Sequence, residues 1–259
     1  MIRALWSAAS GMGGQQLAVD TIANNIANVN TTGFKRSRVE FQDVFYALLV
    51  PVDAPEQDLM QVGHGVAPAG IRRFMTLGNL EETGNELDWA IQGKGFFRVG
   101  YTVDGPVEFT RAGNFGLGAD GRIVAPGGRY LLGSAGFLTV PAETVAISVE
   151  ADGQVSALRA DGSRSSVGQL QLALFPNPAG LEARGENLYR TTPSSGQPVL
   201  RAPRAGGAGT LVQGFLERSN VELIDEIVGL ISAQRAYELN SRVVHAADEM
   251  LGMANNLRR

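Results

Sequence analysis

The C-terminal stretch SNVELIDEIVGLISAQRAYELNSRVVHAADEMLGMANNLRR, residues 219–259, decides the fold. Ser219 and Glu222 have the S-x-x-E spacing of a capping box, and no proline interrupts the residues that follow. Acidic residues crowd the first turns, and Arg258 and Arg259 close the last turn, which suits the helix dipole. The stretch predicts one long helix, which at about 1.5 Å per residue reaches roughly 57 Å.

Apolar residues recur every seven positions along this predicted helix. The main stripe is Leu223, Leu230, Tyr237, Val244 and Leu251. A second stripe is Ala236, Val243, Met250 and Leu257, and the face is widened near its start by Ile224, Ile227 and Ile231. A seven-residue repeat on so long a helix favours a coiled-coil or bundle role.

The N-terminal residues 1–28 show the same period. One series is Leu5, Met12, Val19 and Ile26, and the other is Met1, Ala8, Gln15, Ile22 and Val29. This helix should end near Asn30 to Gly33, because Gly33 can adopt a left-handed cap. Periodicity alone is equally compatible with an ordinary helical hairpin buried in one domain.

Composition excludes several classes of protein. The chain has 259 residues, a net charge of −4 and no cysteine, so disulfides and thiolate metal sites are excluded. It has no basic stripe with interleaved aromatic residues, and we therefore expect no nucleic acid partner. It has no apolar run near the ~20 residues that cross a bilayer, and the amphipathic start does not resemble a Sec signal peptide. We expect no membrane insertion.

Residues 34–75 read as an extended, irregular segment with room for a short hairpin. The segment contains Pro51, Pro55 and Pro68. So long an irregular segment is unusual inside a compact domain. We therefore expect this linker or insertion to make contacts between subunits.

Residues 76–212 read as an all-β domain. The expected strands are Trp89–Gln92, Gly95–Val99, Val107–Thr110, Arg122–Val124, Val145–Glu150, Gln154–Leu158, Gln169–Phe175 and Asn187–Thr191. A surface loop is expected over Gly196–Gly209. Asp-Gly pairs begin at Asp104, Asp120, Asp152 and Asp161. They are typical of two-residue hairpin turns with positive φ, and metal-site carboxylates are the alternative.

No catalytic constellation is present in the sequence. His64 lies between two glycines, His245 lies on the long helix, and neither has partners for a metal site or a triad. The run Gly93-Lys94-Gly95 lacks the spacing of a phosphate loop. The glycines at 11, 13 and 14 favour close helix approach or local bending. We expect no enzyme activity, no cofactor and no metal site.

Long motifs resemble those of a known family. The run NNIANVNTTGFK, residues 24–35, resembles the signature of the bacterial flagellar basal-body rod and hook proteins. The opening IRALWSAASGM, the central LDWAIQGKGFFRV of residues 87–99 and the closing QGFLERSNVELIDEIVGLISAQRAYELNSRVVHAADEML of residues 213–251 are similar to the distal rod members of this family. Residues 47–68 depart most from its pattern.

The resemblance implies an α+β fold in which the terminal helices pair as a coiled-coil layer. Residues 1–33 and 213–259 would form the inner layer of a hollow helical tube, and residues 76–212 its outer β domain. The tube would be the distal rod, a drive shaft that transmits torque to the hook and conducts exported substrates. Polar residues that interrupt the stripes would face the channel: Gln234, Arg235, Glu238, Asn240, Ser241 and Arg242.

The implied partners are copies of the chain itself, proximal rod proteins, hook protein, the surrounding periplasmic and outer-membrane ring proteins and the flagellar export apparatus. The implied location is the basal-body rod across the periplasm, reached by type III export without a Sec signal. Two alternatives stay open. One is a proximal rod component, although proximal members usually lack the Arg-Ala-Leu-Trp opening, and the other is a non-polymeric surface binding module.

Particular residues are assigned to the polymer interface. They are the stripe residues Leu5, Met12, Val19, Ile22, Ile26 and Val29, with Leu223, Ile227, Leu230, Tyr237, Val244 and Leu251. Asn24, Asn25, Asn28 and Asn30 either form a helix end and turn or pair with neighbouring subunits. Phe41 and Phe45 have the Phe-x-x-x-apolar spacing associated with export recognition, and packing is the alternative.

Isolated helices are marginal without tertiary packing. We therefore expect the terminal helices to be largely disordered in the free subunit and to fold on incorporation into the polymer.

Overall fold

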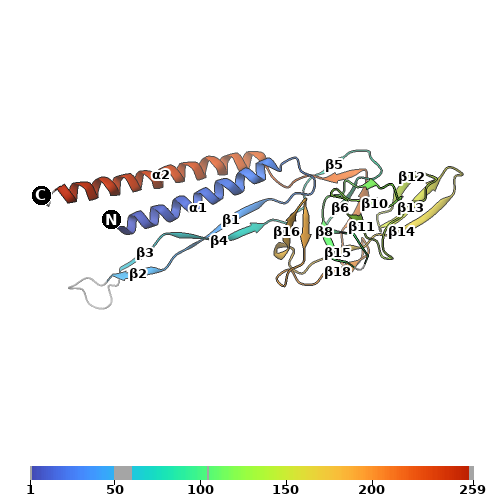
Figure 1. Cartoon of the computed structure of the whole chain (residues 1–259), viewed down its shortest axis with the longest axis horizontal. Helices are drawn as coiled ribbons and strands as arrows, with labels where there is room; N and C mark the ends of the chain where they lie inside the picture. The colour runs from blue at the N-terminus through green and yellow to red at the C-terminus, as the bar shows by residue number, and fades with distance from the viewer. Residues whose placement is uncertain (1, 50–59, 104, 257–259) are drawn as a thin grey trace. The chain divides into compact units, whose positions relative to one another are not determined.

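The computed structural model describes residues 2–49, 60–103 and 105–256, and its fold is α+β (Figure 1). It has an N-terminal helix α1 (Ile2–Ala27), a C-terminal helix α2 (Leu223–Asn256) and a mostly-β middle. The expected fold class is confirmed at this level. In this part of the chain, neither helix combines the length and apolarity that a membrane span needs.

Some predicted features lie outside the described residues. They are Met1 and Leu257 of the stripes, the closing Arg258 and Arg259, Pro51 and Pro55 of the extended segment, and Asp104 of the first Asp-Gly pair.

The chain divides into two compact units. The helical unit comprises Met1–Ala27, Ser37–Arg73 and Glu222–Arg259, and the β unit comprises Asn28–Arg36 and Phe74–Val221. The segment expected as a linker over residues 34–75 is therefore divided between the two units. Residues 37–73 are grouped with the helices, and residues 34–36 and 74–75 are grouped with the β unit.

In the helical unit, α1 and α2 lie side by side and run in opposite directions (Figure 1). The residues they bury are small or polar. Those of α1 are Ala8, Gly11, Gly14, Thr21 and Asn25, and those of α2 are Glu226, Ala233 and Ala247. A Cβ placed on Gly11 would lie 2.9 Å from Nδ2 of Asn240. This glycine therefore permits close helix approach, as predicted.

The buried seam of α2 is offset from the predicted main stripe. The seam follows Glu226, Ala233, Asn240 and Ala247, which repeat every seven residues. Leu230, Val244 and Leu251 of the main stripe are half-buried beside it. Leu223 and Tyr237 of the same stripe are 46% and 41% exposed. Asn240, expected at the channel, is half-buried in the seam and donates to the backbone oxygen of Ala236.

The predicted capping box at the start of α2 is not formed. The Ser219 hydroxyl accepts the backbone N–H of Val221 at 3.3 Å, and the helix begins at Leu223. The first helical bond runs from the N–H of Glu226 to the backbone oxygen of Glu222. Ser219 lies too far before this first turn to cap it.

Residues 37–49 and 60–73 contain paired strands where an irregular segment with room for a short hairpin was expected. Strand β1 (Ser37–Asp43) pairs antiparallel with β4 (Val66–Arg73), and β2 (Tyr46–Leu49) pairs with β3 (Met60–Gly63). A bulge between Glu40 and Phe41 lies opposite the stretch that contains Pro68, where a proline can be tolerated. The Ser10 hydroxyl of α1 accepts the N–H of Val66 at 3.2 Å, which fixes the hairpin to the helix.

The β unit is built from short antiparallel strands. They are β5 (Leu80–Glu82), β6 (Trp89–Gln92), β7 (Phe97–Gly100), β8 (Glu108–Thr110), β9 (Gly116–Leu117), β10 (Ile123–Val124), β11 (Tyr130–Leu131), β12 (Thr144–Val149), β13 (Gln154–Arg159), β14 (Arg164–Gln169), β15 (Leu172–Leu174), β16 (Glu182–Gly185), β17 (Leu188–Arg190), β18 (Val199–Arg201), β19 (Thr210–Gln213) and β20 (Phe215–Glu217). A 3-10 turn covers Pro178–Gly180.

The largest sheet has seven strands in the order β16-β17-β8-β7-β11-β10-β9, and β12-β13-β14 form a second sheet. The pairs β15-β18, β19-β6 and β20-β5 complete the unit. Strand β18 corrects the expected surface loop over Gly196–Gly209, because its exposed residues find partners in β15. The eight expected strands lie within a few residues of β6, β7, β8, β10, β12, β13, β15 and β17.

The motif at residues 87–99 contributes several residues to the core of the β unit. Trp89, Ile91, Phe97 and Val99 are fully buried in its main cluster. Phe96 enters a second cluster with Phe109, Phe175 and Tyr189, because neighbouring strand residues point to opposite faces.

The Asp-Gly pairs at Asp120, Asp152 and Asp161 form turns, as expected, but of another type. Only the glycines have positive φ, at 72°, 90° and 80° for Gly121, Gly153 and Gly162. Each aspartate accepts the N–H two residues on through Oδ1: Arg122 at 3.2 Å, Gln154 at 3.0 Å and Ser163 at 2.8 Å. The side chains therefore stabilise Asx turns, and the left-handed residue is the glycine alone.

Candidate assembly interface

The side of α2 that faces away from α1, its outer face, carries several large apolar residues. The exposed apolar residues of α2 include Ile224 (78%), Val228 (61%), Ile231 (45%), Leu239 (61%), Val243 (45%), Met250 (45%) and Met253 (59%). At about 100° per residue, Ile224, Val228, Leu239 and Met253 project from the side of the helix opposite Glu226, and the exposed Arg235 and Arg242 share that side. Val243 and Met250 lie three residues beyond the seam residues Asn240 and Ala247, so the second predicted stripe, whose Ala236 is half-buried, flanks the seam.

A surface helix normally turns polar and charged residues to solvent, so large apolar residues on the outer face of α2 indicate a contact there. Exposed apolar patches mark interaction surfaces. Of the predicted interface residues, Leu223 and Ile227 flank the seam and are 46% and 43% exposed. The outer face of α2 is thus a candidate surface for a contact with another chain.

The predicted interface residues of α1 are mostly half-buried. Leu5, Met12, Val19, Ile22 and Ile26 all fall in this class, as does Val29 after the helix. The start of α1 is more open, because Ile2 and Trp6 are 68% and 70% exposed and line a shallow apolar hollow with Leu5 and Ala9.

The asparagines have separate roles. Asn25 is 1% exposed, and its amide donates to the Ser37 oxygen at 2.7 Å and to Oε2 of Glu226 at 3.0 Å. Its Oδ1 accepts the N–H of Ser37 at 3.0 Å. This amide therefore joins α1, β1 and α2 of one chain, and a contact of Asn25 to a neighbouring subunit stays a prediction.

The remaining asparagines lie at or beyond the helix end. Oδ1 of Asn28 accepts the Thr31 hydroxyl at 3.1 Å, and Oδ1 of Asn30 accepts from Arg218 at 3.2 Å. These two hydrogen bonds lie within the β unit and support the interpretation that Asn28 and Asn30 form a helix end and turn. Asn24 is exposed on α1.

Gly33 takes the predicted left-handed conformation, with a φ of 71°. A Cβ at this position would lie 2.7 Å from the backbone nitrogen of Ala112, and the Gly33 N–H donates to the Glu217 oxygen at 2.8 Å. Only glycine fits so close a backbone approach.

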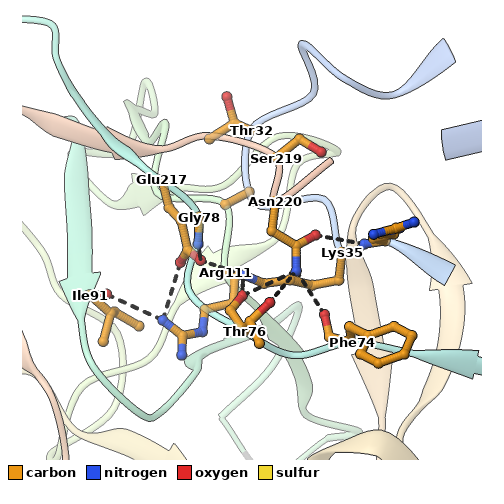
Figure 2. A network of polar contacts seen from close by, with 12 residues as sticks. Thr32, Lys35, Phe74, Thr76, Gly78, Ile91, Arg111, Glu217, Ser219 and Asn220 are labelled. Atoms are coloured by element: carbon orange, nitrogen blue, oxygen red, sulfur yellow. Dashed lines mark hydrogen bonds and ion pairs between the residues drawn. The ribbon is translucent and has the colours of Figure 1, made fainter. Parts of the chain in front are cut away.

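Lys35, two residues after Gly33, belongs to a buried charge network (Figure 2). Nζ of Lys35 contacts Oε1 of Glu217 and donates to the Thr76 oxygen at 2.6 Å. Oε2 of Glu217 accepts from Arg111 at 3.1 Å. The side chains of Lys35 and Glu217 are fully buried, and that of Arg111 is 5% exposed. Burial lowers the pKa of both Lys35 and Arg111, and the Glu217 carboxylate opposes that shift.

Further hydrogen bonds complete the network. The Gly78 N–H donates to Glu217, and Arg111 donates to the oxygens of Ile91 and Gly93 at 3.2 Å and 2.7 Å. Nearby, Oδ1 of Asn220 accepts the N–H of Arg36 at 2.7 Å (Figure 2). The network ties the end of the signature motif to the closing strand of the β unit. Sequence reasoning missed it, although Lys35 and Glu217 both lie inside quoted motifs.

The two phenylalanines proposed for export differ in their surroundings. A Cβ on Gly14 would lie 2.9 Å from Cε1 of Phe41, so this ring packs on α1 and is 41% exposed. Phe45 is 90% exposed between β1 and β2. The packing alternative therefore fits Phe41, whereas Phe45 packs little against the part of the chain that the structure describes.

Three family models match the chain. "Flagella basal body rod protein" matches residues 5–35, "Flagellar hook protein FlgE/F/G D1 domain" matches residues 90–157, and "Flagellar basal body rod FlgEFG protein C-terminal" matches residues 212–257. The three matches fall on α1 with the signature motif, on the β unit, and on α2.

Curated relatives match over the full length. The chain is 43% identical to the flagellar basal-body rod protein FlgG of Borreliella burgdorferi, over 100% of both chains. It is 42% identical to FlgG of Caulobacter vibrioides, over 99% of this chain and 100% of the relative. It is 34% identical to the basal-body rod protein FlgF of the same organism, over 90% and 88%.

Proposed function

The chain belongs to the flagellar basal-body rod protein family, and from this premise we propose that it is a structural subunit that polymerises into the distal rod. The rod is a hollow helical drive shaft of the flagellar basal body that transmits motor torque to the hook and conducts exported substrates. The proposal assigns the chain no catalytic activity.

One observation carries the proposal: α2 exposes large apolar side chains on the side that faces away from α1. The seam with α1 covers one face, and Ile224, Val228 and Leu239 on the other are at least 61% exposed. Burying one such side chain contributes about 1.5–3 kcal/mol. Repetition of this contact along a helix of 34 residues gives a polymer a strong driving force.

The terminal helices form the inner coiled-coil layer of the tube in this proposal, and the β unit forms the outer layer. A polar strip on α2 then faces the channel. Its residues are Gln234, Glu238, Arg242, His245 and Glu249, all exposed and spaced by three or four residues. A polar wall avoids trapping unfolded apolar segments in transit. The strip shares Gln234, Glu238 and Arg242 with the channel face expected from the sequence.

Rod and hook components are the partners implied by family membership. We propose in addition the proximal rod proteins, the hook protein, the surrounding rings and the flagellar export apparatus. A proximal rod component is the second candidate, and the higher identity to the FlgG relative than to FlgF, 42% against 34% in one organism, favours the distal assignment.

Glutamate substitutions on the outer face of α2 test the proposal. Val228→Glu combined with Leu239→Glu should raise the critical concentration for polymerisation of the purified chain at least about tenfold, because 1.4 kcal/mol already gives that factor. Sedimentation of polymer from monomer measures it.

Gln234→Glu, on the polar strip, is the matched control and should leave the critical concentration unchanged. Polymerisation of the double variant at the wild-type critical concentration would exclude the outer face as the assembly surface. Rods of normal length in flagellated cells that lack the chain would exclude the distal rod function itself.

A further inference from the structure

A small pocket opens on the β unit, beside the buried charge network. Its volume is about 230 Å³. Phe96, Phe175, Met75 and Pro176 provide apolar walls, and Lys94 and Arg111 provide positive charge. Pockets for free ligands are typically about 300–1,000 Å³. This smaller volume suits a single inserted side chain.

The walls of the pocket are rigid. Phe96 and Phe175 meet edge to face with ring centroids 5.7 Å apart, and both are buried in the second core cluster. The Arg111 guanidinium lies over the Phe96 ring at 5.4 Å, and its buried Nε has no hydrogen-bond partner among residues 2–49, 60–103 and 105–256. Such a site favours an aromatic ring that carries a carboxylate near it.

We propose that Phe45 of a second copy fills this pocket, with Asp43 of that copy beside Lys94. The inference rests on the proposed function, since it identifies one of the contacts between copies in the polymer. Among the described residues, Phe45 is the most exposed large apolar side chain, at 90%. Asp43 precedes it by two residues, and alternate residues of an extended chain share a side.

The backbone holds Phe45 in place on both sides. Asp43 pairs with Val66 and Tyr46 pairs with Gly63, and the Val44 N–H donates to the Gly65 oxygen at 3.0 Å. The Tyr46 hydroxyl donates to Oδ2 of Asp43 at 2.9 Å. A carboxylate accepts several hydrogen bonds, so Asp43 can also receive a lysine. The backbone of Phe45 is therefore held in place before docking, so the residue loses little conformational freedom when it binds.

The proposed polymer supplies a second copy as the occupant. Phe45 lies eight residues beyond Ser37, or about 26 Å along the ladder at 3.3 Å per residue. An exposed aromatic side chain at the far end of this ladder is available to a neighbouring copy.

Disulfide crosslinking tests the contact, because the chain has no cysteine of its own. Copies with Phe45→Cys are mixed with copies with Pro176→Cys, polymerised and oxidised. A disulfide-linked dimer is expected in the polymer and not in dilute monomer. The matched control replaces Phe45→Cys by Ile71→Cys, an exposed residue of the same hairpin, and should give no dimer. Polymer without the specific crosslink overturns the inference.

Further variants separate this contact from other roles of Phe45. Phe45→Ala should raise the critical concentration of the purified chain at least about tenfold, as expected for an aromatic anchor, and Ile71→Ala should not. Asp43→Lys and Lys94→Asp should each weaken assembly, and together they should restore it.

The outcomes distinguish the two proposals. Normal assembly of purified Phe45→Ala with loss of its secretion would assign Phe45 to export and overturn the pocket contact, while polymerisation through α2 stands. Failure of the wild-type chain to polymerise at all would instead remove the proposed function.

Discussion

At the scale of single residues, charge balance governs the site around Glu217. Two cations, Lys35 and Arg111, share this one carboxylate away from water. Removing one cation leaves a balanced pair, whereas removing the carboxylate leaves two buried cations. Breaking a buried pair in this way costs about 3–5 kcal/mol.

The first prediction follows from this asymmetry. Glu217→Gln should destabilise the β unit by about 3–5 kcal/mol, and Lys35→Met should cost clearly less, because Arg111 still pairs with Glu217. Urea unfolding of the full chain, followed by tryptophan fluorescence from the buried Trp89, measures both. Equal losses from the two substitutions would show that charge balance does not control the site.

At the scale of elements, the hairpin turns show what local sequence specifies. Asp-Gly pairs predicted turns, and turns occur at Asp120, Asp152 and Asp161. The turn type differs because each aspartate satisfies a backbone N–H with its own carboxylate, which keeps its φ negative. Only the glycine then requires the left-handed region.

The second prediction compares glycines of two turns. Gly162 has a φ of 80° and open space around it, so Gly162→Ala should cost about 1 kcal/mol from backbone strain alone. A Cβ on Gly121 would also lie 2.7 Å from the Val140 oxygen, so Gly121→Ala should cost at least about 1 kcal/mol more. Gly116→Ala, with open space and an ordinary φ, is the control for urea unfolding.

Sequence indicated both helices, the β character of the middle and the family motifs, because periodicity and turn residues are local signals. It did not identify the inner side of α2, since the residues buried there are small or polar while large apolar residues lie on the outer face. The Lys35–Glu217 contact joins residues 182 positions apart and leaves no local signal. The sequence left room for a short hairpin after residue 33 but did not predict the length of the β1–β4 ladder, because β4 contains Pro68 and pairs with β1 through a bulge.

At the scale of the whole molecule, the size of the side chains that α1 and α2 bury determines how stable the helical unit is in a single copy. The intrachain seam of the helical unit is made of Ala8, Gly11, Ala233 and Ala247, with polar residues between them. Small side chains return little free energy on burial. The large side chains of α2, such as Ile224 and Leu239, lie on the outer face. A single copy therefore stabilises its helices weakly, and neighbouring copies supply the missing burial.

Amide hydrogen exchange on dilute monomer and on polymer tests this claim most directly. The account predicts fast exchange over Leu5 to Ile26 and over α2 in the monomer, and strong protection of both in the polymer. The core of the β unit around Trp89 and Phe97 should be protected in both states and serves as the internal reference. Equally strong protection of α1 and α2 in monomer and polymer would contradict the account.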